Sequence, residues 1–145
     1  MFYKKIYLIF IFILAGCAGS VSNLGEGSQA MMYPITVEQG ENVILQALSE
    51  NIPGKAITPV LYPSRGFTVG TKILFDSHTI TATMQRAFAV DGDGNELEGI
   101  SFTVQNAGTI PLSFGSKAKP LFDKINSLAM AISRPLAVVR TEPIR

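Results

Sequence analysis

Residues 79–90 read TITATMQRAFAV, and hydrophobic and polar side chains alternate along most of this stretch. One side of an extended chain would carry the hydrophobic set Ile80, Ala82, Met84, Phe88 and Val90. An alternation of period two is typical of a β-strand with one face in the core and the other in water. Strands of this kind belong to antiparallel sheets, because strands buried on both faces are hydrophobic throughout.

Arg86 is the charged residue on the hydrophobic side of this strand. An arginine can bury its methylene groups along a hydrophobic surface while its guanidinium group stays in water. We therefore interpret Arg86 as a residue at the end of the sheet, and not as part of a functional site.

Three further stretches are predicted to form strands. In GFTVGTKILF, residues 66–75, the hydrophobic side carries Phe67, Val69, Ile73 and Phe75. The stretch 98–105 places Ile100, Phe102 and Val104 together, and TIPLSF, residues 109–114, is a short fourth run. Proline cannot donate a hydrogen bond to a neighbouring strand, so Pro111 confines this run to an edge or an irregular position.

Two helices flank these strands. Thr36 and Gln39 have the spacing of a capping box, which predicts a helix over about 38–51, although Gly40 weakens its first turn. KAKPLFDKINSLAMAIS, residues 117–133, is the clearest helix, and Pro120 suits its first turn. Its hydrophobic stripe consists of Leu121, Phe122, Ile125, Leu128, Ala129 and Ile132.

The predicted order is a helix, a meander of about four antiparallel strands, a second helix and a short strand at 136–140, followed by a tail. This order indicates an α+β domain over residues 34–145, with both helices on one face of the sheet. Residues 17–33 are small, polar and rich in Gly and Ser, which is typical of a flexible tether.

The overall composition narrows the functional classes. The 145 residues contain 12 Lys and Arg, 11 Asp and Glu and one Cys. Because no basic stripe is present, we expect no nucleic-acid partner. One Cys excludes a disulfide framework, so burial alone must hold the domain together.

DGDGNELEG, residues 91–99, superficially resembles a calcium loop because Asp91, Asp93 and Asn95 alternate. The pattern fails at its sixth position, Glu96, where Gly is required, and at its twelfth, Phe102, where a bidentate Glu belongs. We expect a tight hairpin turn and no built metal site, with a weak adventitious cation site as the alternative.

The single histidine, His78, follows Asp76 and Ser77. Catalytic triads assemble from separated segments, whereas consecutive residues of a strand point to opposite faces. We interpret these three residues as a turn between strands. No nucleophile with a base and no zinc ligand set is evident, so we expect no catalytic residue, no metal and no enzyme.

YPSRGFTVG, residues 62–70, lacks the glycines and the following helix of a phosphate-binding loop. Tyr and Arg are enriched at protein interfaces, and Tyr62 and Arg65 are therefore the candidate interface residues, with a solvated loop as the alternative.

The N-terminus indicates export. Lys4 and Lys5 precede a short hydrophobic run, which suits a signal peptide over residues 1–16. Leu14-Ala15-Gly16-Cys17 resembles the lipobox of bacterial lipoproteins at all four positions. The resemblance implies cleavage between Gly16 and Cys17 and a diacylglycerol group on the Cys17 thiol, and the freed amino group is often acylated too. Two or three acyl chains hold a protein stably at a bilayer.

The resemblance also implies a location in the cell envelope. The residue after Cys17 is Ala18, not the aspartate that retains lipoproteins in the inner membrane, which favours the periplasmic side of the outer membrane in a Gram-negative cell. We expect no cofactor other than the covalent lipid. Its partners would be membrane lipid through Cys17 and an envelope protein, and self-association stays open.

Two functions remain open at this point. The first is an adaptor in an envelope assembly, such as secretion, conjugation, appendage or outer-membrane machinery. The second is a ligand-binding lipoprotein with an apolar pocket between the helices and the sheet.

Overall fold

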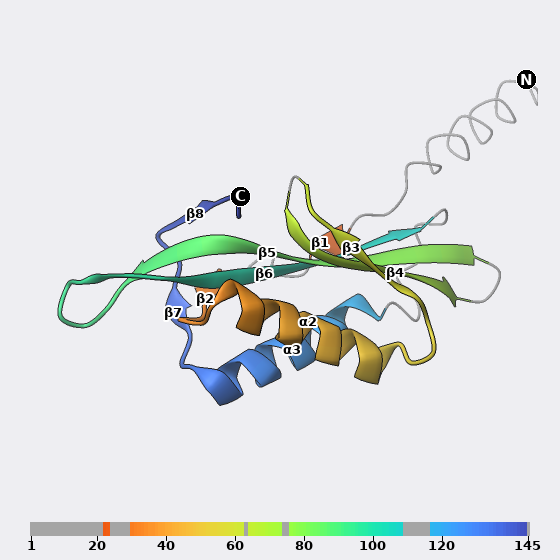
Figure 1. Ribbon diagram of the computed structural model, residues 1–145, viewed down its shortest axis with the longest axis horizontal. Coiled ribbons are helices and arrows are strands. Elements are labelled where there is room, and N and C mark those ends of the chain that lie inside the picture. The colour runs from red at the N-terminus through yellow and green to blue at the C-terminus, as the bar shows by residue number, and fades with distance from the viewer. Residues whose placement is uncertain (1–21, 24–29, 63, 74–75, 109–116, 145) are drawn as a thin grey trace, which may run out of the picture.

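The computed structural model describes residues 22–23, 30–62, 64–73, 76–108 and 117–144. An antiparallel sheet with the strand order β1-β6-β5-β4-β3 lies at its centre. Its strands are β1 (Ser22–Asn23), β3 (Ile57–Val60), β4 (Arg65–Ile73), β5 (Asp76–Val90) and β6 (Glu96–Gly108). Helices α2 (Val37–Asn51) and α3 (Ala118–Ile132) lie together on one face of this sheet (Figure 1). The predicted α+β class is therefore confirmed.

The meander consists of β3, β4, β5 and β6, and its first strand was not predicted. Strand β3 has the sequence ITPV, which is short and contains Pro59. Its position at the edge of the sheet fits this proline, because edge strands tolerate a missing N–H group. The predicted fourth run, residues 109–114, and Phe75 lie outside the described residues.

Helix α2 begins with the predicted capping box. The Thr36 side chain accepts a hydrogen bond from the Gln39 backbone N–H (3.2 Å), and the Gln39 side chain accepts one from the Thr36 N–H (2.9 Å). Gly40 is buried, and a Cβ added there would lie 2.8 Å from Sδ of Met84. The glycine in the first turn therefore lets the helix approach the sheet closely.

Helix α3 buries most of its predicted stripe. Leu121, Ile125 and Ala129 are fully buried, while Phe122 and Leu128 are partly buried against the same core. Ile132, the last residue of the helix, is 49% exposed, so the prediction that it belongs to the buried stripe is wrong. The buried face ends one turn before the helix does.

The face of the sheet that packs against the helices carries the predicted hydrophobic residues. This holds for the first part of β5 and for the part of β6 that pairs with it. The buried residues are Val69 of β4, Ile80, Ala82 and Met84 of β5, and Ile100, Phe102 and Val104 of β6. Pairing of Ile80 with Val69 and of Ala82 with Val104 places these side chains on one face.

Beyond Met84, other residues of β5 become buried. Ala87 and Ala89 are fully buried and pack with Met32, whereas Val90 is 49% exposed. The prediction that Val90 faces the core is therefore wrong. Phe88, on the same side as Val90, is buried as predicted, with Arg140 over its ring, so both faces of β5 are covered here. Val90 is the last residue of the strand and lies beyond this cover.

Three short strands complete this part of the fold. Strand β2 (Met31–Met32) pairs with β7 (Leu136–Ala137), and β8 (Arg140–Glu142) pairs with residues 86–88 of β5. Strand β8 continues the edge of β5 where β4 ends, since the first residue of β4 pairs with Met84.

The C-terminal prediction of one strand at 136–140 and a tail needs correction. The strand is divided into β7 and β8, and β8 extends into the predicted tail because the edge of β5 beyond β4 is open for pairing. Ile144, two residues past β8, is buried in the main core.

The last residues of the predicted tether belong to the fold. Met32 and Tyr33 are buried. The backbone N–H and carbonyl of Tyr33 exchange hydrogen bonds of 2.8 and 2.9 Å with Ile100. Burial raises the pKa of the Tyr33 side chain, whose hydroxyl donates to Asn126 (3.0 Å). The chain is thus fixed to β6 before α2 begins.

Candidate functional site

The turn between β3 and β4 exposes two large hydrophobic side chains. Leu61 is 73% exposed and Tyr62 is 88% exposed. Figure 1 shows this turn rising from the sheet on the side away from the two helices. Exposed hydrophobic side chains that lie together can mark an interaction site. We call residues 61 and 62 the Leu61–Tyr62 turn.

Arg65, the second candidate interface residue, has a different role in the structure. Its Nε lies 2.6 Å from Oε1 of Glu41 on α2, and the two side chains are 38% and 26% exposed. This ion pair ties the start of β4 to the helix. Arg65 therefore has a structural contact, while Tyr62 stays exposed.

The face of the sheet opposite the helices is rich in threonine. By the strand register, it carries Thr58 of β3, Thr68 of β4, Thr79, Thr81 and Thr83 of β5, and Thr103 of β6. Thr68 and Thr81 share a hydrogen bond of 3.1 Å between their hydroxyl oxygens. Neither described helix covers this face, which we call the open face (Figure 1).

His78 lies within β5, where its backbone pairs with Thr71 and Gly108. Because strand pairing already begins at Asp76, the interpretation of residues 76–78 as a turn is wrong. His78 is only 4% exposed, and Thr71 and Asn106 are buried too. His78 is thus a buried strand residue.

Asp91 closes the hairpin between β5 and β6, as the sequence predicts. Its Oδ1 accepts hydrogen bonds from the backbone N–H groups of Asp93 (2.9 Å) and Asn95 (2.8 Å), and Gly94 has a φ of +86°. The hydrogen bonds from Asn95, followed by those from Asp93 and Gly94, lower the pKa of Asp91. Among the described residues, no three His, Cys, Asp or Glu side chains are grouped so that they could hold a metal.

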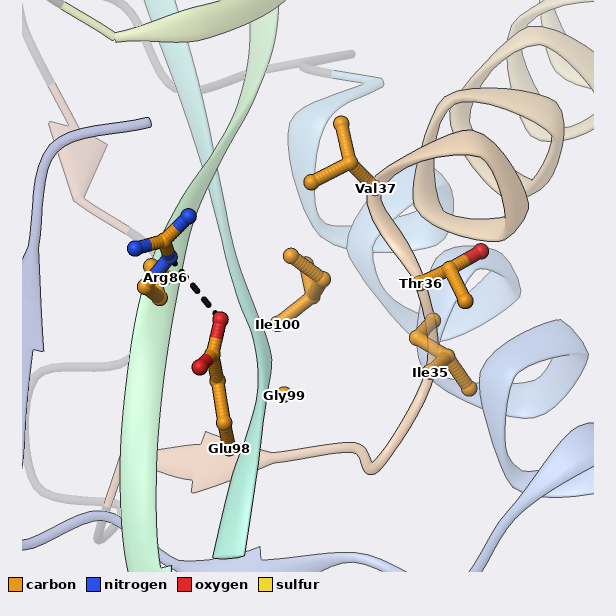
Figure 2. A pocket seen from close by; sticks show the side chains of 7 residues that line it. All are labelled: Ile35, Thr36, Val37, Arg86, Glu98, Gly99 and Ile100. Atoms are coloured by element: carbon orange, nitrogen blue, oxygen red, sulfur yellow. Dashed lines mark ion pairs between the residues drawn. The ribbon is translucent and has the colours of Figure 1, made fainter. Parts of the chain in front are cut away.

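A pocket of about 330 Å³ lies between the start of α2 and the strands β5 and β6. It is lined by Ile35, Thr36, Val37, Arg86, Glu98, Gly99 and Ile100. Figure 2 shows Ile100 between Val37 on the helix side and the two charged residues on the strand side. The sequence suggested an apolar pocket between the helices and the sheet as one alternative, but not these lining residues or the charged wall, because the two walls are far apart in the chain.

Arg86 and Glu98 form the polar wall of the pocket. Nε of Arg86 lies 2.9 Å from Oε1 of Glu98, and the side chains are 41% and 57% exposed (Figure 2). Since β5 continues to Val90, Arg86 does not lie at the end of the sheet as expected from the sequence. The one signal for this site was a charged residue on a hydrophobic strand face.

Comparison with known proteins adds no relative: the chain matches no protein-family model, no curated protein and no solved structure. In the part of the chain that the structure describes, neither helix has the length and hydrophobicity needed to cross a membrane.

Proposed function

We propose that this chain is a lipid-anchored adaptor of the bacterial cell envelope, which binds another envelope protein through the Leu61–Tyr62 turn and the adjoining open face. The exposure of Leu61 and Tyr62, at 73% and 88%, is the observation that carries this proposal. Tyrosine supplies a large contact area and is enriched among the residues that dominate binding energies.

The open face supports the same role. Its threonine hydroxyl groups can donate and accept hydrogen bonds, so a partner can be positioned there without the burial of unpaired charges. The helices occupy the other face of the sheet, which leaves this one accessible around the turn (Figure 1). The turn would act as the hydrophobic anchor and the open face as the polar rim of the interface.

The anchor rests on the lipobox resemblance of residues 14–17 and is tested by itself. Replacing Cys17 with Ser removes the thiol that would carry the lipid. We expect incorporation of a radiolabelled fatty acid into the wild-type protein and none into Cys17→Ser. Equal labelling of both proteins would contradict the lipid anchor. It would not bear on the proposed binding surface, which is tested separately.

The interface is tested by site-specific photocrosslinking of the full chain in cells. A photoreactive residue in place of Tyr62 should give one defined adduct with another envelope protein. The matched control is the same residue in place of Asp93, which is also exposed but lies at the far hairpin turn. An equally strong adduct from position 93, or an adduct from position 62 containing only a second copy of this chain, would contradict the adaptor role.

A further inference from the structure

The pocket between α2 and the strands β5 and β6 carries an inference that does not depend on the adaptor role. We propose that it binds a small zwitterion with an aliphatic side chain, of the chemical class of the free α-amino acids. The ligand's carboxylate would lie at Arg86, its ammonium group at Glu98, and its side chain against Ile100 and Val37.

The charges of the pocket wall select this class. Arg86 and Glu98 lie 2.9 Å apart through Nε and Oε1, and both side chains are partly exposed, at 41% and 57%. A guanidinium group has five N–H donors and a carboxylate has two oxygens, so both groups keep hydrogen-bonding capacity for a ligand. A purely anionic ligand is repelled by Glu98 and a purely cationic one by Arg86, whereas a zwitterion complements both.

The other walls supply a hydrophobic surface. Ile35 and Ile100 are 7% and 3% exposed, and Val37 is half-buried at the start of α2. Val37 lies across the pocket from the charged pair, whereas Ile100 lies beside the pair, because it is the strand partner of Arg86 (Figure 2). Small-molecule sites commonly combine a hydrophobic lining with a few polar groups that fix the orientation of the ligand.

The pocket has room for a small ligand. A volume of about 330 Å³ corresponds to roughly ten water molecules at ~30 Å³ each. An amino acid such as leucine, with about nine non-hydrogen atoms, fits this space.

Both walls are fixed before a ligand arrives. The backbone hydrogen bonds between Tyr33 and Ile100 hold the chain that leads into α2, and the capping box holds residues 36–39. Gly99 allows this approach, since a Cβ added there would collide with the carbonyl oxygen of Tyr33 and with Sδ of Met32. A preformed site of this kind loses less entropy on binding than a mobile one.

The experiment is calorimetric titration of the purified full chain with three probes. These are L-leucine, N-acetyl-leucine, which lacks the positive charge, and leucinamide, which lacks the negative charge. We expect leucine to bind at least tenfold more tightly than either analogue. Equal affinities for all three probes, or no saturable binding of leucine by the folded protein, would overturn the proposal.

Variants locate the binding. Arg86→Gln and Glu98→Gln should each weaken leucine binding at least tenfold. Glu98→Gln should also reduce the difference in affinity between leucine and N-acetyl-leucine, because the carboxylate that would bind the ammonium group is gone. Lys119→Gln is the matched control, because it breaks an ion pair of 2.7 Å with Asp123 on the exposed side of α3.

Val37→Phe keeps the charged pair and fills the pocket. We expect this variant to lose leucine binding while its far-ultraviolet circular dichroism stays that of the wild type. Unchanged leucine affinity in Val37→Phe, or in both glutamine variants, would place the ligand elsewhere and overturn the assignment.

Discussion

The β5–β6 hairpin has two halves that are buried by different means. In the half near Ile80, two helices pack on one face of the sheet and cover a continuous hydrophobic set. In the half near Ala87, the short strands β2, β7 and β8 surround the hairpin, and a small second cluster forms around Met32. Local periodicity describes the first half well, whereas contacts between distant segments determine the second.

This difference explains the position of the pocket. The pocket lies where the cover by α2 gives way to the cover by the short strands, at Arg86 and Ile100. A charged side chain is tolerated on the core side of β5 at this point because it reaches solvent and pairs with Glu98. The boundary between the two halves is thus also the place where the sheet presents polar groups next to hydrophobic ones.

The largest expected difference between the halves concerns the removal of buried side chains. Ile80→Ala should lower the free energy of unfolding by about 2–5 kcal/mol, because Ile80 is fully buried under the helices. Leu97→Ala, in the second half, should cost only about 1–2 kcal/mol because Leu97 is partly exposed. Urea unfolding measures both values, and an equal loss of stability in the two variants would contradict the difference in burial between Ile80 and Leu97.

A second comparison uses two glycines of the sheet. Gly99→Ala should destabilise the protein by about 1–3 kcal/mol, since the added methyl group collides with the carbonyl oxygen of Tyr33. Gly70→Ala should leave the free energy of unfolding unchanged or raise it by up to about 1 kcal/mol, since nothing lies within 4 Å of its added Cβ. Thermal unfolding of both variants distinguishes them. A harmless Gly99→Ala would contradict the close attachment of the chain at Tyr33.

The attachment of β8 should depend on Arg140. Its guanidinium carbon lies 3.5 Å from the centre of the Phe88 ring, and its nitrogens pair with Glu96 and Glu142. The carboxylate of Glu96, above all, raises the pKa of Arg140. In Arg140→Gln, amide hydrogen exchange in residues 140–142 should become at least several-fold faster, while exchange in β4 stays unchanged. Equal protection of β8 in both proteins would show that backbone pairing alone holds it.

The smallest expected effect is the acid dependence of the hairpin turn. Hydrogen bonds from Asn95, above all, lower the pKa of Asp91 in the folded protein below that of a free aspartate. The charged carboxylate therefore adds stability above the unfolded-state pKa, and this stability is lost as the pH falls below about 4 through the folded-state pKa. The stability difference between the wild type and Asp91→Asn should shrink over this range. A difference that is constant from pH 7 to pH 2 would contradict the hydrogen bonds of the carboxylate.

Much of the first half of the hairpin, and of the two helices that cover it, could be predicted from the sequence because the relevant signals are local. The capping box of Thr36, the alternation around Ile80 and the stripe of Leu121 each depend on neighbouring residues. The burial of Ala87 and Ala89 could not be predicted, because it depends on Met32, far away in the chain.

The candidate sites show the same limit. Tyr62 is a candidate interface residue from its type alone, whereas its exposure follows from the turn after β3, a strand that the sequence did not reveal. The pocket required Arg86 to meet residues 35–37, which only the packing of α2 on the sheet brings together.

The most direct test of the adaptor role is hydroxyl-radical footprinting of the full chain in its native envelope and as purified protein. Tyr62 and Met130, which are 88% and 57% exposed in the isolated protein, should both be oxidised after purification. In the envelope, we expect oxidation of Tyr62 to fall at least fivefold relative to that of Met130, because a partner covers the turn. If the ratio of Tyr62 oxidation to Met130 oxidation is the same in the envelope and after purification, the proposal that the Leu61–Tyr62 turn is a docking surface is contradicted.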